Sequence, residues 1–224
     1  MFAGHVGAGL AIGRVEPRVN VAVFVGAALL LDVLFWSFAL LGWESVSIPQ
    51  DYAVRRELAF VFPWTHGLVA SLAWSAGAAW FAFVASHWLR SGRGRVAGLV
   101  AAAVFSHWVL DALVHRPELP VLGEHSPHVG LALWDHLWLS LAVETAIALG
   151  ALWFFLAGRT LTRGRSIALA SLVLIVVVMT VTGMTVAPPP PSALALAVSS
   201  LVTLVVVCAC AAWIDLARGA RVPS

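Results

Sequence analysis

Long apolar stretches separated by shorter polar segments dominate the chain. They cover approximately residues 20–41, 66–89, 96–115, 131–157, 166–187 and 193–216. Each is long enough to cross the hydrocarbon core of a bilayer as a helix, which takes about 20 apolar residues. The longest connection is the segment 42–65, and the prolines of PPPPS, residues 188–192, cannot continue a helix. The pattern predicts an all-α integral membrane protein with about six transmembrane helices.

Composition agrees with this pattern. Of the 224 residues, 61% are hydrophobic and 11% are charged, and the mean hydropathy is +0.95. A soluble domain is nearer to half apolar and a quarter charged. The formal net charge is +2, and the arginines stand in short clusters between apolar stretches rather than on one face. We therefore expect membrane lipids as partners and no nucleic-acid partner.

The arginines are divided unevenly between the two sides that the alternating spans define. One side carries ten of them: Arg14, Arg18, Arg90, Arg93, Arg95, Arg159, Arg163, Arg165, Arg218 and Arg221. The other side carries three: Arg55, Arg56 and Arg116. Because cytoplasmic loops are enriched in basic residues, both termini are predicted to be cytoplasmic and segment 42–65 to face outward.

Several ionisable residues interrupt the apolar stretches at helical spacing. In SHWVLDALVH, residues 106–115, three of them stand four residues apart: His107, Asp111 and His115. A second stripe with the same period consists of His136, Ser140 and Glu144. Residues at i and i+4 share a helix face. A charge in mid-membrane costs about 2.5–3.5 kcal/mol on insertion scales, so these groups are expected to have a role.

The predicted depths bring further ionisable groups to the same level. Asp32 lies slightly past the midplane toward the outside, and His66 opens the second span at its outer end. The last two spans carry almost nothing ionisable apart from Asp215. Imidazole and carboxylate together suit zinc or another divalent transition metal. The alternative is that these groups hydrogen-bond helices together or relay protons.

The N-terminal segment adds His5. If residues 2–13 form a short helix that re-enters the membrane, His5 lies about 14 Å from Arg14 and reaches the midplane near Asp32. A loose cytoplasmic N-terminus is the alternative. Three other histidines, His87, His125 and His128, are expected to be solvated or interfacial.

Five segments together resemble one group of bacterial membrane proteins. They are FAGHVGAGLA, LLLDVLFWSFALLGWESV, FPWTHGLVASLAW, SHWVLDALVHRPELP and GLALW, within about residues 2–145. The chain is similar in these segments to the YdjM-like family, described as inner-membrane, predicted metal-dependent hydrolases. The resemblance implies a location in the bacterial inner membrane. Because the last two spans carry neither a motif nor a stripe of ionisable residues, we expect a metal-site helical bundle over residues 1–157 and two transmembrane helices without site residues over 158–224.

The order of the candidate ligands also resembles that of zinc-dependent phospholipase C-type enzymes. Carried over, this resemblance implies the metal ligands His5, Asp32, His66, His107, Asp111 and Glu144. The chain departs from the pattern at Ser140, where those enzymes have a histidine four residues before the late Glu. His115 or His136 is the candidate substitute.

We therefore expect a membrane-embedded hydrolase that uses a divalent metal, zinc above all. Such an ion lowers the pKa of water and polarises an ester or phosphoryl oxygen. His66 and His107 would fix it, and Asp32 or Asp111 would bridge metals or accept the proton of water. The depth of the site favours a lipid-like, amphipathic substrate near the outer face. A transporter or proton/metal conduit, or a structural membrane protein, would use the same residues differently; the oligomeric state is left open.

Overall fold

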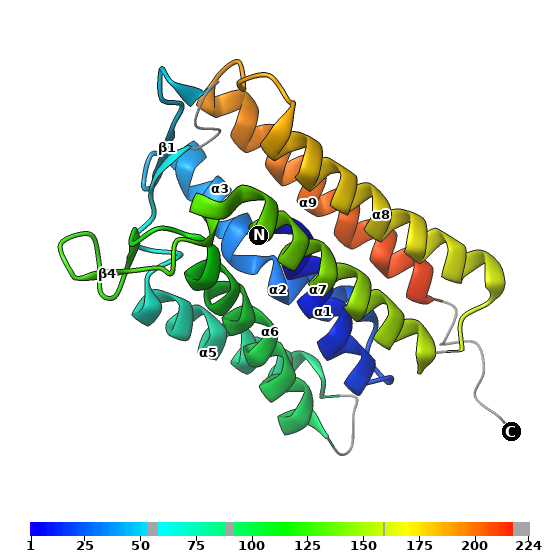
Figure 1. Ribbon diagram of the computed structural model, residues 1–224. Helices are drawn as coiled ribbons and strands as arrows, with labels where there is room; N and C mark the ends of the chain where they lie inside the picture. The colour runs from blue at the N-terminus through cyan, green and yellow to red at the C-terminus, as the bar shows by residue number, and fades with distance from the viewer. Residues whose placement is uncertain (53–57, 88–91, 159, 217–224) are drawn as a thin grey trace, which may run out of the picture.

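The computed structural model is a bundle of helices (Figure 1). It describes the whole chain except residues 53–57, 88–91, 159 and 217–224. The helices are α1 (Phe2–Val15), α2 (Val21–Ala28), α3 (Leu30–Leu41), α5 (Leu68–Ala85), α6 (Arg93–Val114), η1 (Leu133–His136), α7 (Leu137–Ala157), α8 (Arg163–Thr185) and α9 (Ala193–Asp215). Two short antiparallel pairs lie between helices: β1 (Ser45–Ser47) with β2 (Ala59–Val61), and β3 (Leu119–Pro120) with β4 (His128–Val129).

The expectation of an all-α membrane protein is confirmed. Among the described residues, five helices are long and apolar enough to cross a membrane, and a sixth span results if α2 and α3 are counted as one. The predicted spans match the helices to within a few residues, apart from the first and from the start of 131–157, where η1 precedes α7. The stretch predicted over 20–41 is two helices bent by 51°.

The bend at Leu29 has an identifiable partner on another helix. The carbonyl of Ala28, at the end of α2, accepts a hydrogen bond of 2.7 Å from Nδ1 of His107 on α6. A side chain that inserts into the helical hydrogen-bond ladder in this way is a common cause of a sharp kink. As a result Asp32 lies in the first turn of α3, where the helix dipole stabilises a carboxylate.

The N-terminal helix α1 lies inside the bundle. It packs against α2, α6, α7 and α8 (Figure 1), and His5 and Leu10 are each only 1% exposed. Two glycines allow this close packing. A Cβ on Gly9 would lie 2.5 Å from Cα of Val25, and a Cβ on Gly7 would lie 3.0 Å from Cα of Ala148. The N-terminal segment is therefore a buried helix and not a loose tail.

Replacing Gly9 with leucine is expected to destabilise the protein strongly. The backbones of α1 and α2 meet at this position, so a larger side chain must push the helices apart, which costs at least about 1–3 kcal/mol. Thermal unfolding in detergent measures the effect. Gly98→Leu is the matched control, because a Cβ there meets nothing within 4 Å. Equal stability of the two variants would contradict the close packing of α1.

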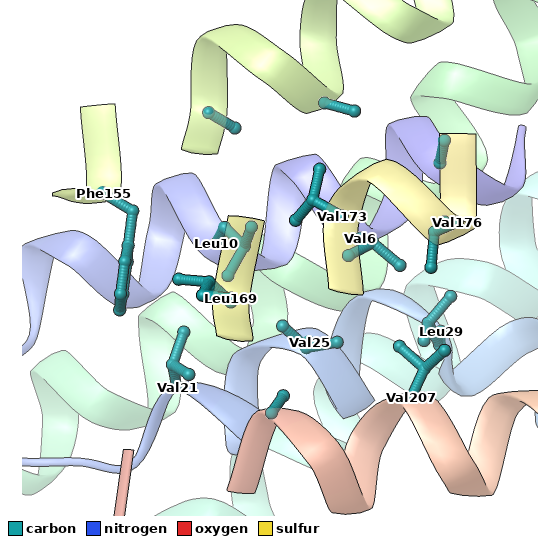
Figure 2. Packing of buried hydrophobic residues seen from close by; sticks show 14 of the residues in the cluster. Val6, Leu10, Val21, Val25, Leu29, Phe155, Leu169, Val173, Val176 and Val207 are labelled. Carbon is teal, nitrogen blue, oxygen red and sulfur yellow. The ribbon is translucent and has the colours of Figure 1, made fainter. Parts of the chain in front are cut away.

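One apolar cluster joins the N-terminal and C-terminal helices. Val6 and Leu10 of α1 contact the cluster formed by residues of α2, α7, α8 and α9. Figure 2 shows the labelled members Val6, Leu10, Val21, Val25, Leu29, Phe155, Leu169, Val173, Val176 and Val207. The α8–α9 pair is therefore held to α1 and α2 through this shared core.

Asp215 has a structural role at the arginine-rich end of the bundle, the side predicted to be cytoplasmic. Its Oδ2 accepts a hydrogen bond of 2.8 Å from the backbone N–H of Val21, the first residue of α2. The side chain of Asn20 donates in turn to the carbonyl of Ala212 on α9. A carboxylate at a helix N-terminus satisfies free donors and interacts favourably with the dipole. The end of α9 is thus fastened to the beginning of α2.

Candidate metal centre

Five of the six residues implied as metal ligands meet between the helices. His5 comes from α1, Asp32 from α3 and His66 from the turn before α5, while His107 and Asp111 lie one turn apart on α6. Four of them are at most 3% exposed, and Asp32 is partly exposed. They form two groups that could hold a metal ion: His66, His107 and Asp111, and His5, Asp32 and His107.

The first group has the spacing of a metal site. Nε2 of His66 lies 3.2 Å from Nε2 of His107. Oδ2 of Asp111 lies 3.1 Å from the His107 nitrogen and 3.5 Å from the His66 nitrogen. Around a tetrahedral zinc with bonds of about 2.0–2.2 Å, ligand atoms lie about 3.3–3.6 Å apart. The three atoms therefore fit one face of such a coordination sphere.

Asp32 approaches the same point from α3. Its Oδ1 lies 3.8 Å from Nε2 of His66 and 3.7 Å from Nε2 of His107. These distances are slightly longer than a ligand pair requires, and the side chain is 24% exposed. Asp32 can thus serve as a further metal ligand, or lie beside the metal in contact with water.

His5 contacts both residues of α6. Its ring is stacked on that of His107 with centroids 3.6 Å apart, and its Nε2 lies 3.1 Å from Oδ1 of Asp111. The same Asp111 oxygen accepts a hydrogen bond of 3.2 Å from the amino group of Met1. The carboxylate of Asp111 therefore faces His5 and Met1 with one oxygen, and His66 and His107 with the other.

The protonation of His107 follows from its backbone partner. A carbonyl can only accept a hydrogen bond, so Nδ1 of His107 carries the proton that it donates to Ala28. In the neutral ring Nε2 then holds a lone pair, directed at the cluster. This is the arrangement by which a second partner orients a metal-binding histidine.

His66 is oriented through Thr65 and Glu44. The Thr65 hydroxyl donates to Oε2 of Glu44 at 2.7 Å and lies 2.8 Å from Nδ1 of His66. Its single proton is used on Glu44, so it accepts from His66. Oε1 of Glu44 accepts from the backbone N–H groups of Trp64 and Thr65. Burial raises the pKa of Glu44 to about 7, against the opposing effect of the hydrogen bonds from Thr65 and the Trp64 backbone.

Replacing Thr65 with valine is expected to weaken metal binding about 10–100-fold, the usual cost of losing a partner that orients a ligand. Valine has nearly the same shape but cannot connect Glu44 to His66. The affinity for zinc would be measured by competition with a chromophoric chelator. Thr65→Ser, which keeps the hydroxyl, is the matched control. Equal affinity of the valine and serine variants would show that the hydroxyl does not orient His66.

Glu144 is buried nearby but stands outside both ligand groups. Its Oε1 accepts a hydrogen bond of 3.3 Å from the backbone of Gly4, and Oε2 is buried without a hydrogen-bond partner. Ser140, one turn earlier on α7, is likewise fully buried. The role of Glu144 as a ligand stays a prediction; the residue lines a cavity that Asp111 also lines.

The two candidate substitutes lie in different surroundings. His115 caps α6, is 5% exposed, and pairs with Glu118 through Nδ1. It lines the same cavity but belongs to neither ligand group. His136 ends the short helix η1 and is exposed. The predicted stripe of residues 136, 140 and 144 is therefore buried only over its last two members, because α7 begins after His136.

The cavity beside the cluster has a volume of about 520 Å³. Its polar wall contains Asp32, His66 and Asp111, and its apolar wall contains aromatic side chains such as Phe35, Phe60 and Phe62. Such a volume lies within the range of about 300–1,000 Å³ typical of ligand pockets.

Comparisons of the chain with protein-family models, curated proteins and solved structures find no match. The interpretation of the site therefore depends on its own chemistry.

Proposed function

We propose that the protein is a membrane-embedded, metal-dependent hydrolase that binds a divalent metal, zinc above all, through His66, His107 and Asp111. The observation that carries this is the meeting of two Nε2 atoms at 3.2 Å. Both rings are held by their Nδ1 partners so that their lone pairs face the same point. Two lone pairs so close repel each other unless a cation lies between them, and the adjacent Asp111 adds negative charge.

The remaining polar groups suit water activation. The metal would supply a lowered pKa for water and polarise the scissile ester or phosphoester. Asp111 would bind the metal with Oδ2, which faces His66 and His107, while its Oδ1 faces Met1 and positions His5. Asp32 is more exposed and lines the cavity, and we assign it the role of accepting the proton of water.

The substrate that we propose is a lipid-like ester or phosphoester. The cavity joins the polar cluster to an aromatic wall within helices that have the length and hydropathy of membrane spans. The arginine distribution supports cytoplasmic termini and a site near the outer face. The segments quoted above support membership of the YdjM-like family and a location in the bacterial inner membrane.

Purified wild-type protein tests the proposal directly. We expect about one zinc, or a similar divalent ion, per chain, and hydrolysis of phospholipids or simple phosphodiesters that stops on chelation and returns with added zinc. A protein without metal and without turnover on any ester would refute the hydrolase. Ion flux in proteoliposomes would favour a conduit instead. Against a conduit, large apolar side chains such as Leu10, Phe155 and Leu169 fill the core toward the arginine-rich end.

Hydrolysis is expected to decrease as the pH is lowered through about 6–7. Imidazoles bind a metal only when neutral, and water attacks well only when deprotonated. Protonation of the ligand histidines and of the attacking hydroxide therefore lowers activity at acidic pH. Protonation of Glu44, whose pKa is about 7, acts in the same direction because it weakens the acceptor behind Thr65 and His66. The ratio kcat/KM measured between pH 5 and 9 gives the profile. Activity that rises on acidification would contradict the assignment.

A further inference from the structure

The α8–α9 pair forms one wall of the cavity beside the candidate metal centre. From α8 the wall includes Thr180, Gly183 and Met184, and from α9 it includes Ser199, Ser200 and Thr203. Asp32, His66 and Asp111 line the same cavity. The two C-terminal helices thus contribute no ionisable group to the cluster, but they shape the space in front of it.

We propose that this wall, together with the aromatic side chains of α3 and β2, binds an acyl chain of a membrane lipid. The lipid would place its ester or phosphoester linkage toward Asp32 and His66. The identity of the reacting linkage rests on the proposed hydrolase function. Binding of the chain does not, because it depends on apolar contacts and needs no metal.

The lining of the cavity suits a hydrocarbon chain. Phe35, Trp36 and Phe60 offer apolar surface, and Met184 has the flexible, polarizable side chain that adapts to an irregular ligand. The hydroxyl of Thr203 donates to the carbonyl of Ser199 within α9, so it costs little beside an apolar chain.

Thr180 offers a polar contact within the same wall. Its Oγ1 is buried and has no hydrogen-bond partner. A buried hydroxyl without a partner costs about 1–3 kcal/mol, so a ligand that supplies an acceptor is favoured. A carbonyl or phosphoryl oxygen at the head of the chain would provide this acceptor if the Thr180 side chain rotates toward the cavity.

The rim of the cavity reaches the outside of the bundle. Met179 lines the cavity and is 45% exposed, and Ser199 lines it and is also exposed. Both residues lie within helices that qualify as membrane spans, so this surface faces lipid. An acyl chain can therefore enter sideways from the bilayer, without the molecule leaving the membrane.

Gly183 provides a way to fill the cavity without disturbing the helix. A Cβ built on it meets nothing within 4 Å, although the residue lines the cavity. Gly183→Leu would therefore extend a side chain into the space that we assign to the acyl chain. Gly150→Leu on α7 is the matched control, because a Cβ there also meets nothing within 4 Å and the residue is exposed.

The probe is phosphatidylcholine with a diazirine in one acyl chain, incorporated in vesicles with the purified full-length protein. After illumination, mass spectrometry should find labelled wild-type peptides from α8 and α9 at residues of the wall. Gly183→Leu displaces about two methylene groups of the chain and should lower this labelling about tenfold. Ser200→Leu fills the same wall from α9 and should act likewise, and Gly150→Leu should match the wild type.

Two controls keep the outcome interpretable. Metal content and elution volume on gel filtration verify that each variant is folded. The labelling is repeated with chelated wild-type protein, where it should persist while hydrolysis stops; this separates chain binding from the proposed catalysis. Undiminished labelling of the wall in both Gly183→Leu and Ser200→Leu would overturn the proposal. So would labelling confined to lipid-facing residues of α8 such as Leu174.

Discussion

Replacing His107 with alanine is expected to abolish stoichiometric metal binding by the purified protein. The imidazole belongs to both groups of candidate ligands, and its Nε2 lies within 3.2 Å of donor atoms of His66 and Asp111. Its orientation is fixed by the hydrogen bond to the carbonyl of Ala28. Loss of a partner that merely orients a ligand costs about 10–100-fold, so loss of the ligand itself should cost more. Elemental analysis after gel filtration measures the occupancy.

Two other histidines serve as controls for this prediction. His87 and His125 are exposed and stand outside the ligand groups found among the described residues. His87→Ala and His125→Ala should keep the wild-type metal content. If His107→Ala retains a full equivalent of metal, the ion is held elsewhere and the assigned centre is wrong. A variant of Ala28 cannot make this test, because its interacting group is a backbone carbonyl.

The spans of the fold could be predicted because hydropathy and length decide them. The break at Leu29 could not, since no proline marks it and the nearest glycine, Gly26, lies inside α2. It depends on a hydrogen bond between His107 and Ala28, which are 79 positions apart in the sequence. The same break puts Asp32 into the first turn of a helix, an environment that no pattern over residues 20–41 shows.

The candidate site likewise has a part that the sequence could predict and a part that it could not. Spacing and depth predicted that His107 and Asp111 share a face with access to Asp32 and His66, because period and span length fix these relations. The partners behind His66 lie in segment 42–65, which the sequence presented as a connector. Glu44 is only 3% exposed there and reaches Thr65 because β1 and β2 pair across that segment. A glutamate followed by a strand pattern could have been the signal.

The contribution of α8 and α9 was also beyond sequence reasoning. Serines and threonines in a membrane helix look alike whether they face lipid, another helix or a cavity, since each can bond to its own backbone. Ser199 and Thr203 do so, yet they line the cavity. Only the packing of α9 against α3 turns this face toward the site.

Asp111→Asn is expected to lower hydrolytic turnover at least about 100-fold, even at saturating zinc. The amide keeps the shape of the carboxylate but removes the charge that faces His5, His66 and His107. The NH2 group of the asparagine would donate hydrogen bonds to the lone pairs of the histidine nitrogen atoms and so compete with the metal for them. The geometry of water activation should therefore be lost while the helices stay packed.

The assay compares detergent-solubilised wild type and variant on phospholipids and simple phosphodiesters, with zinc added to excess. Unchanged elution and thermal unfolding would show that the variant is folded, because Val104 and Val114 on the same helix remain in the core. Asp32→Asn, measured in parallel, should also lower kcat but keep more of the metal, since Asp32 lies farther from both imidazoles. Wild-type turnover in Asp111→Asn would remove this carboxylate from the mechanism. Loss of metal without recovery at any zinc concentration would show that Asp111 acts mainly as a metal ligand and not in the activation of water.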